Sequence, residues 1–188
     1  ITMDADARAE LKSETEQDVL ASFRLSGDAA VWNNDTYVRA FIGDVGYADG
    51  VTEGTLYVTG TAVNRLVGTV DATVELDGAR TVLQDGVSVP GSIVVDDGTA
   101  VLDTDLGAAD TANITVNDGG ILNINVDAGG AFDPANLTLQ AGAGLGLMVD
   151  RDLSDAVWGG EQAHIYIAKE DYAGTLTLNA ADTMIGSD

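Results

Sequence analysis

An internal repeat in the middle of the chain limits the folds that this sequence can adopt more than any other feature. Residues 112–127 and 135–150 align without a gap at an offset of 23 residues, and a weaker copy at 93–98 precedes them at an offset of 21. The matching apolar positions of the two clear copies are Ile114 with Leu137, Val116 with Leu139, Leu122 with Leu145, Ile124 with Leu147, and Val126 with Val149. A glycine turn divides each copy, so each unit predicts two β-strands joined by a turn.

Two mainly β architectures accommodate this repeat. A period of about 21–23 residues fits one rung of a β-solenoid, in which like residues stack on like residues. Two successive hairpins of a β-sandwich or jelly roll produce a similar alternation. Because only two copies are clear and residues 36–84 do not follow the period, we favour a sandwich-like or jelly-roll-like body. A short β-solenoid, with rungs of the length of this period, is the alternative.

The N-terminal segment at 1–25 differs in pattern from the rest of the chain. Residues 4–23 contain no glycine or proline and are rich in good helix formers. Ala7, Leu11, Val19 and Phe23 fall on one narrow helical stripe, and Asp4 or Asp6 is suited to cap the first turn. We therefore expect an N-terminal helical segment or arm at 1–25, followed by an all-β domain at 26–188.

The charge of the chain constrains its surroundings and its partners. The net charge is −23, from 31 acidic and eight basic residues, of which only Lys12 and Lys169 are lysines. Such a surface disfavours nucleic acids and anionic membranes, which attract clusters of Lys and Arg. The composition resembles that of proteins from salt-in halophiles and their viruses, although a secreted marine or bacterial surface protein also fits. We expect an extracellular, virion or cell-surface location and no membrane insertion, because no apolar run reaches about 20 residues.

Residues that carry chemistry are few. His164 is the only histidine and the chain has no cysteine, so transition-metal sites and thiol chemistry are disfavoured. His164 alternates with Ile165 and Ile167, which predicts a position on the solvent face of a strand. The acidic residues Asp96, Asp97, Asp103 and Asp105 are candidate Ca²⁺ ligands on loops. The alternative for them is a solvated acidic face, and we expect no other cofactor.

Two further residue sets have possible roles at the surface. Asn34, Asn113 and Asn136 begin Asn-x-Thr sequons, which permit N-glycosylation in an exported protein. The geometry of the repeat explains Asn113 and Asn136 equally well, since they are equivalent positions. Exposed aromatic residues would suit a glycan-binding platform, and the candidates are Trp32, Trp158, Tyr166 and Tyr172.

These observations favour a non-enzymatic structural subunit of an extracellular assembly. The candidates are a virion component, such as a capsid-decorating, turret or fibre subunit, and a surface-layer or appendage protein from a high-salt environment. The expected partners are copies of the chain itself and other proteins of the assembly. The alternatives are a carbohydrate-binding or adhesin module and, third, a secreted glycan-active hydrolase that uses a carboxylate pair.

Overall fold

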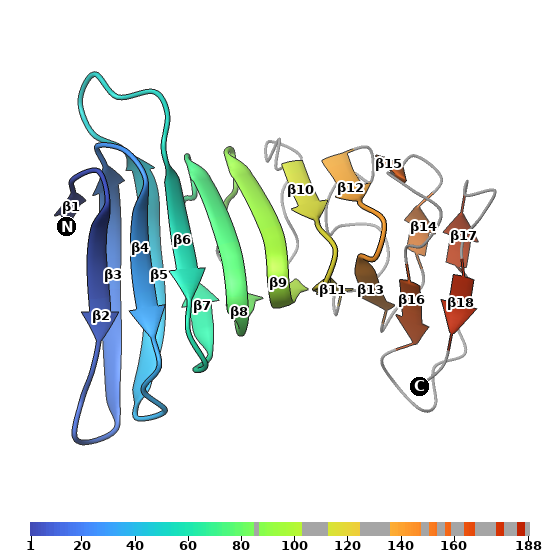
Figure 1. Cartoon of the computed structure of the whole chain (residues 1–188), viewed down its shortest axis with the longest axis horizontal. Coiled ribbons are helices and arrows are strands. Elements are labelled where there is room, and N and C mark those ends of the chain that lie inside the picture. The colour runs from blue at the N-terminus through green and yellow to red at the C-terminus, as the bar shows by residue number, and fades with distance from the viewer. Residues whose placement is uncertain are drawn as a thin grey trace.

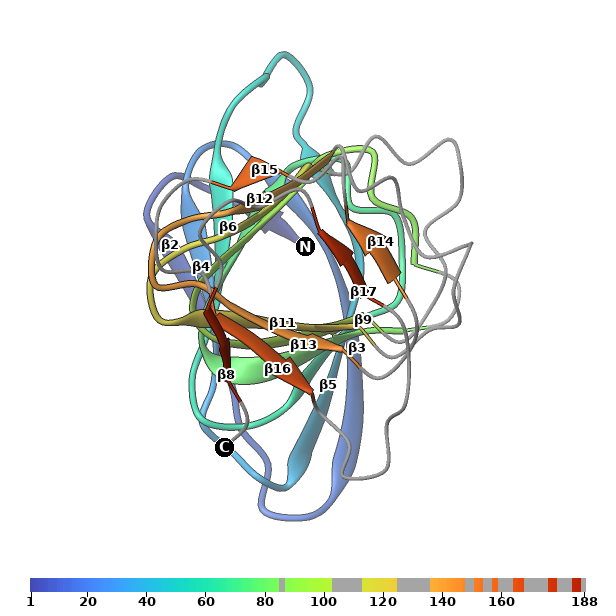
Figure 2. The ribbon, with the colours of Figure 1, turned by 90° about the vertical axis from the view of Figure 1, so that its right-hand side faces the viewer.

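A computed structural model describes the chain as a stack of parallel β-strands. The described residues are 1–84, 87–102, 113–124, 136–147, 151–153, 157–158, 164–167, 176–178 and 184–186, with side chains up to Gly146 except Ala79. Figure 1 shows the strands following one another along the long axis of the molecule, from the N-terminus at one end toward the C-terminus at the other. Viewed along this axis, the strands form walls around a common interior (Figure 2).

The first wall is a continuous ladder of parallel strands, in which each strand pairs with the next one along the stack. Its strands are β2 (Ala7–Leu11), β4 (Ala29–Asn33), β6 (Thr55–Thr59), the first half of β8 (Thr73–Leu83), the first half of β9 (Ser92–Leu102), β10 (Asn113–Val116), β12 (Leu137–Leu139) and β15 (Val157–Trp158). Side chains alternate between the interior and the outer surface along each strand.

The second wall runs beside the first in the same order. Its strands are β3 (Gln17–Leu25), β5 (Val38–Tyr47), β7 (Asn64–Leu66), the second halves of β8 and β9, β11 (Gly120–Ile124), β13 (Gly144–Leu147), β16 (His164–Ile167) and β18 (Met184–Gly186). The strands β8 and β9 turn the corner between the two walls, and the register shifts around Asp77 where β8 bends.

A third side closes the stack at its N-terminal end. Strand β1 (Thr2–Met3) pairs with the end of β3, which pairs with the end of β5, and single bridges continue this ladder from Val45 to Val70 and from Thr69 to Ser88. A separate pair, β14 (Arg151–Leu153) with β17 (Leu176–Leu178), lies on the right-hand side of the stack in Figure 2.

Columns of apolar side chains fill the interior. One column of the first wall is in register through five strands and is fully buried: Leu56, Val74, Ile93, Ile114 and Leu137. Burying each such side chain contributes roughly 1.5–3 kcal/mol relative to leaving it exposed. Because every rung covers the one before it, the core is continuous along the stack.

The architecture is therefore a β-solenoid, the alternative prediction, and the preferred sandwich or jelly roll was wrong. The repeat copies are stacked rungs, since Ile114 pairs in register with Leu137, its equivalent in the second clear copy. The weaker copy is the preceding rung, because Ile93 pairs in register with Ile114. Both offsets of the repeat are thus the lengths of single rungs.

The N-terminal half was misread because its rungs differ in length. The rung that leads from Ala29 to its partner Leu56 is long, whereas the rung that leads from Asn64 to its partner Thr81 is short. No single offset aligns both pairs, so the solenoid leaves no visible period in this part of the sequence.

The predicted N-terminal helix was also wrong, since this segment forms β2 and β3 and the described residues contain no α-helix. A spacing of four residues satisfies both a helical stripe and a strand that alternates every two residues. A helix and a strand predict different burial at some positions, and the burial observed at these positions is that of a strand. Ala9 and Ala21 also pack against the core, whereas Leu20, which lies beside the predicted helical stripe, is 71% exposed. Pairing with β4 and β5 overrides the helix propensity of the segment.

Glycines at one corner allow the chain to pass from the first wall to the second. Gly60, Gly78, Gly119 and Gly142 all have positive φ angles, from 82° to 116°, which side chains with a Cβ rarely adopt. At Gly60 the backbone also passes so close to the Asn33 carbonyl that a Cβ would overlap it.

No helix in the described part of the chain is long and apolar enough to cross a membrane.

Candidate functional site

Carboxylates at the corners link one rung to the next. Asp28 Oδ1 accepts a 2.8 Å hydrogen bond from the backbone N–H of Thr55, and Asp44 Oδ1 accepts one of 2.9 Å from Thr69. Asn34 Oδ1 accepts a 3.1 Å bond from the backbone N–H of Thr61 in the same way. At corners the ladder of backbone hydrogen bonds is interrupted, so these side chains satisfy donors that would otherwise depend on solvent. Some of the acidic residues therefore stabilise the fold itself by linking successive rungs.

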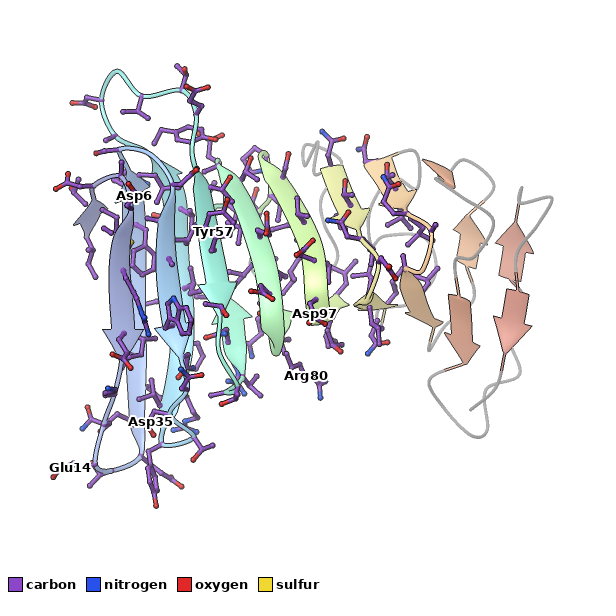
Figure 3. All side chains as sticks on the ribbon, viewed as in Figure 1. Asp6, Glu14, Asp35, Tyr57, Arg80 and Asp97 are labelled. Carbon is purple, nitrogen blue, oxygen red and sulfur yellow. The ribbon has the colours of Figure 1, made fainter. Side chains whose placement is uncertain are left out.

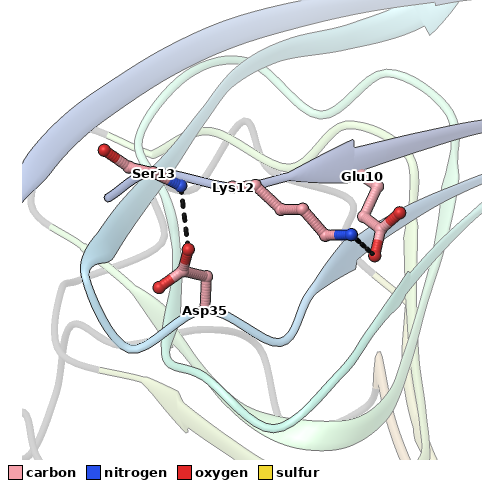
Figure 4. Close-up of polar contacts among 4 residues, drawn as sticks. All are labelled: Glu10, Lys12, Ser13 and Asp35. Atoms are coloured by element: carbon pink, nitrogen blue, oxygen red, sulfur yellow. Dashed lines mark hydrogen bonds and ion pairs between the residues drawn. The ribbon is translucent and has the colours of Figure 1, made fainter. Parts of the chain in front are cut away.

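A cleft of about 540 Å³ lies between two such corners near the N-terminus, lined by residues 11–14 and 34–37. Asp35 joins the two corners, because its carboxylate accepts a 2.8 Å bond from the backbone N–H of Ser13 and a 2.9 Å bond from that of Tyr37. Lys12 Nζ forms a 2.9 Å ion pair with Glu10 beside it (Figure 4). The cleft thus contains a lysine and carboxylates whose hydrogen bonds hold the loops in place.

Asp35 in this cleft and Glu10 beside it are both stabilised in the ionised form. The backbone N–H groups of Ser13 and Tyr37 lower the pKa of Asp35, and the hydrogen bond from Lys12 lowers the pKa of Glu10. A glycosidase acid needs the opposite shift, because it must carry a proton near neutral pH. Asp35 and Glu10 therefore do not provide the raised pKa that a hydrolase at this cleft would need.

A raised pKa occurs instead on the outer surface of the first wall. Burial and then the neighbouring charges of Asp96, Asp77 and Asp28 raise the pKa of Glu75. Burial followed by the charges of Asp28 and Glu75 also raises the pKa of Tyr57, which pairs in register with Glu75. Figure 3 shows Tyr57 and Asp97 on the front of the stack. We call Glu75, Asp77, Asp96 and Asp97 the acidic patch.

The predicted aromatic platform is only partly assembled. Trp32 lies on the outer side of the first wall, where the Arg8 guanidinium stacks 3.8 Å from its ring centroid and covers one face. Trp158 pairs with Leu139, in a register column whose described members are buried, and Tyr166 pairs with Gly146. Tyr172 lies outside the described residues. Tyr57, which sequence reasoning missed, is the aromatic residue on the strand next to Trp32.

The outer surface of the second wall has a different character. Arg39 forms a 2.6 Å ion pair with Asp18, and the Arg65 guanidinium lies 5.5 Å from the ring centroid of Phe41. These residues surround apolar side chains, and the most exposed of these is Leu20. We call Leu20, Arg39, Phe41, Arg65, Arg80 and Val82 the arginine patch. Sequence reasoning missed it because its arginines are far apart and unevenly spaced in the sequence, and only the unequal rung lengths align them.

The candidate Ca²⁺ ligands are divided between described and undescribed parts of the chain. Asp96 and Asp97 lie on β9, and Asp96 Oδ1 accepts a 2.8 Å bond from the side-chain amide of Asn117 on the next rung. Asp103 and Asp105 lie outside the described residues. Among the residues that the structure describes, no group of three or more His, Cys, Asp or Glu side chains is placed to hold a metal ion. A Ca²⁺ site at these four residues stays a prediction.

The sequon asparagines and the histidine occupy separate places along the stack. Asn34 is exposed at a corner, where its Oδ1 atom accepts the bond from Thr61, and Asn113 is exposed at the start of β10. Asn136 directly precedes β12 and is half-buried. His164 pairs in register with Gly144 on β13 and with Met184 on β18. Asn113 and Asn136 lie next to each other on adjacent rungs, since each directly precedes a member of the register pair Ile114 and Leu137, whereas Asn34 and His164 lie on other rungs.

The fold defines the class of this protein as a parallel β-solenoid with rungs of unequal length. No protein-family model matches the chain, and no similar protein was found among curated proteins or among solved structures.

Proposed function

We propose that the chain is a non-enzymatic structural subunit of an extracellular assembly that operates in a saline environment. The roles that fit are a virion component, such as a capsid-decorating, turret or fibre subunit, and a surface-layer or appendage protein. The observation that carries this proposal is the continuous stack of buried apolar columns. Such a stack makes a stiff rod, and its outer walls remain available for contacts with neighbouring proteins.

The placement of the acidic residues supports the saline environment. Asp28, Asp35 and Asp44 bond to backbone groups of neighbouring rungs, while the acidic patch carries several carboxylates close together on one wall. Repulsion among carboxylates destabilises the folded chain at low salt. At about 1 M salt the Debye length falls to roughly 3 Å, and this repulsion is largely screened.

Fractionation of native material in molar salt tests the structural role. With specific antibodies, we expect the protein to sediment with virus particles or cell envelopes and to label their surface in electron micrographs. A protein found wholly in the free fraction as a monomer would contradict the proposal. A parallel titration of stability against salt tests the saline setting, and we expect the midpoint of thermal unfolding to rise steadily from about 0.1 M to about 1 M NaCl.

A glycan-binding or adhesin role is the second candidate, and the adjacent positions of Trp32 and Tyr57 on the first wall favour it. Trp32 is partly exposed beside the stacked Arg8, and Glu10, its register partner on β2, carries a carboxylate that can accept hydroxyl hydrogen bonds. A glycan-binding screen with the wild-type chain and with Trp32→Ala tests this role. Binding that is lost in Trp32→Ala would support it, and the absence of any bound glycan would remove it.

A further inference from the structure

The arginine patch has the composition of a protein interface. Its members on β5, β7 and β8 alternate with buried residues, and Leu20 alternates with the partly buried Val19 and Ala21 of β3, so their side chains lie on the outer surface of the second wall. It combines guanidinium groups with Leu20, Phe41 and Val82. Arginine and large apolar residues are enriched where proteins bind each other, and arginine frequently dominates the binding energy.

The patch also concentrates positive charge on a chain that has very little. Three of the six arginines of the sequence lie in it, although the net charge is −23. Arg39 is paired with Asp18, whereas Arg65 is stacked on Phe41 and Arg80 is exposed. Arg65 and Arg80 form no ion pair within the described part of the chain, so their guanidinium groups remain available for a carboxylate.

The acidic patch on the first wall has the complementary character. Within the part of the chain that the structure describes, its four carboxylates form no ion pair. Burial is the first cause of the raised pKa of Glu75, and the charges of Asp96 and Asp77 add to it, so a cation brought beside Glu75 would relieve repulsion among these carboxylates. The acidic patch therefore gains from a positively charged partner.

The two patches each spread over adjacent strands of the same stack. Neighbouring parallel strands are about 4.8 Å apart on either wall. Asp77 and Asp97 pair in register on the adjacent strands β8 and β9. Arg65 pairs with Val82, so Arg80 lies two residues before the partner of Arg65 and is its diagonal neighbour on β8. Each patch therefore presents more than one charge over adjacent strands, so two arginines of one molecule can contact carboxylates of another.

We propose that the arginine patch of one copy docks on the acidic patch of a second copy. This inference rests on the proposed structural function and identifies the surfaces that associate. The contact joins different surfaces of the two copies, so it leaves a free patch on each and continues into a ring or a filament. Molar salt reduces the repulsion between the strongly acidic copies, and the apolar part of the patch maintains the contact when the charges are screened.

Charge reversal with matched controls tests this docking. Association is measured by sedimentation velocity and light scattering from about 0.1 M to about 3 M NaCl. We expect Arg80→Glu to weaken the association of copies at least about tenfold, because like charges would then face each other. Arg24→Glu is the control, since Arg24 lies on the outer side of the end of β3, outside the patch, and the substitution changes the net charge equally. We expect it to leave association unchanged.

The acidic side is tested with Asp97→Arg, and Asp49→Arg in the exposed loop before β6 is its control. Asp97→Arg is expected to weaken association, although it lowers the net negative charge, and Asp49→Arg is not. Mixing the Arg80→Glu chain with the Asp97→Arg chain is expected to restore association, because the reversed patches attract each other. For the apolar part, Leu20→Ser is expected to weaken association at about 3 M NaCl, whereas Tyr37→Ser, outside the patch, is not.

The outcomes separate this inference from the proposed function. The inference would be overturned if the Arg80→Glu and Asp97→Arg variants associated as strongly as the wild type. The structural role would still be decided by the fractionation of native material. A wild-type chain that stays monomeric at every salt concentration would also overturn the inference. Weakening by both reversals, with restoration in the mixture alone, would establish it.

Discussion

The side-chain amide of Asn33 donates a 3.2 Å hydrogen bond to Asn64 Oδ1, and both residues are completely buried inside the solenoid. Asn64 pairs in register with Thr81, which is also buried, so a short column of polar side chains interrupts the apolar interior. A buried amide is stable only when it is hydrogen-bonded, and this pair therefore favours one alignment of its rungs over shifted ones.

We expect Asn64→Leu to lower the free energy of unfolding by about 1–3 kcal/mol, because the buried Asn33 amide loses its shorter hydrogen bond and keeps only the 3.5 Å bond to the Val63 carbonyl. Replacing both residues, as Asn33→Leu with Asn64→Leu, is expected to recover part of this loss, since no unpaired amide of the pair then remains. Denaturant unfolding of the wild type, both single variants and the double variant in molar salt gives the coupling between them. Additive effects of the two substitutions would contradict the pairing.

The close passage of backbone at Gly60 gives a second prediction. Gly60→Ala is expected to destabilise the fold by about 3 kcal/mol or more, because the φ angle of 116° is strained for alanine and the new Cβ would overlap the Asn33 carbonyl. Gly50 is the matched control, with a φ angle of 79° and no atom within 4 Å of an added Cβ. Gly50→Ala should cost only about 1 kcal/mol. Equal melting temperatures for the two variants would show that the close approach is unimportant.

The links between rungs can be tested at Asp44. Asp44→Ala removes the acceptor of the Thr69 N–H, and we expect a loss of about 0.5–1.5 kcal/mol in the free energy of unfolding. Asp49→Ala removes the same charge from an exposed loop. If charge repulsion alone determined stability, both substitutions would stabilise the protein at low salt. We expect only Asp49→Ala to do so, as measured by thermal unfolding at about 0.1 M NaCl.

Glu75 predicts a specific dependence of stability on pH. Its pKa in the folded protein is raised above the ordinary value of 4.5, so the folded state binds this proton more tightly than the unfolded state does. The contribution of Glu75 to stability therefore falls as pH rises from the ordinary pKa through the raised one. At pH 7, Glu75→Gln should have a free energy of unfolding higher than that of the wild type by up to about 0.5 kcal/mol, as measured by denaturant unfolding. The difference should vanish below pH ~4.

Glu53→Gln serves as the control for that measurement, because Glu53 is exposed in the loop between β5 and β6 and the substitution removes the same charge. A difference between wild type and Glu75→Gln that stays constant from pH 3 to pH 7 would be inconsistent with a raised pKa at Glu75.

The repeat indicated stacked rungs as the alternative to a sandwich, and the described residues pair as that alternative requires, at 114–116 with 137–139 and at 121–124 with 144–147. Similar rung lengths leave a visible period in this part of the sequence. The N-terminal half has the same architecture without a period. The rung from Ala29 to Leu56 is longer by the loop at 48–54, so comparison at any fixed offset misses the pairing. Strand alternation was visible in both halves, but the pairing of strands depends on contacts that a period reveals only when loop lengths are uniform.

The surfaces were harder to predict than the core. The sequence analysis did not identify the corner carboxylates Asp28 and Asp44, because the backbone N–H groups that they bond, those of Thr55 and Thr69, lie on distant parts of the sequence. The arginine patch required the same long-range information, because its three arginines come together only when the rungs are aligned. The composition therefore indicated an acidic surface, but it could not indicate that arginines gather on the second wall.

The unequal lengths of the rungs show where this chain can accept insertions. Strands of successive rungs keep their alignment whether the rung is short, as from Asn64 to Thr81, or long, as from Ala29 to Leu56. The extra residues are therefore carried at corners and leave the columns in place. The loop at 48–54 is a natural point of insertion, where a foreign peptide would project from the rod without unstacking it. A lineage of such proteins could acquire new surface features by lengthening corners one at a time, with the interior unchanged.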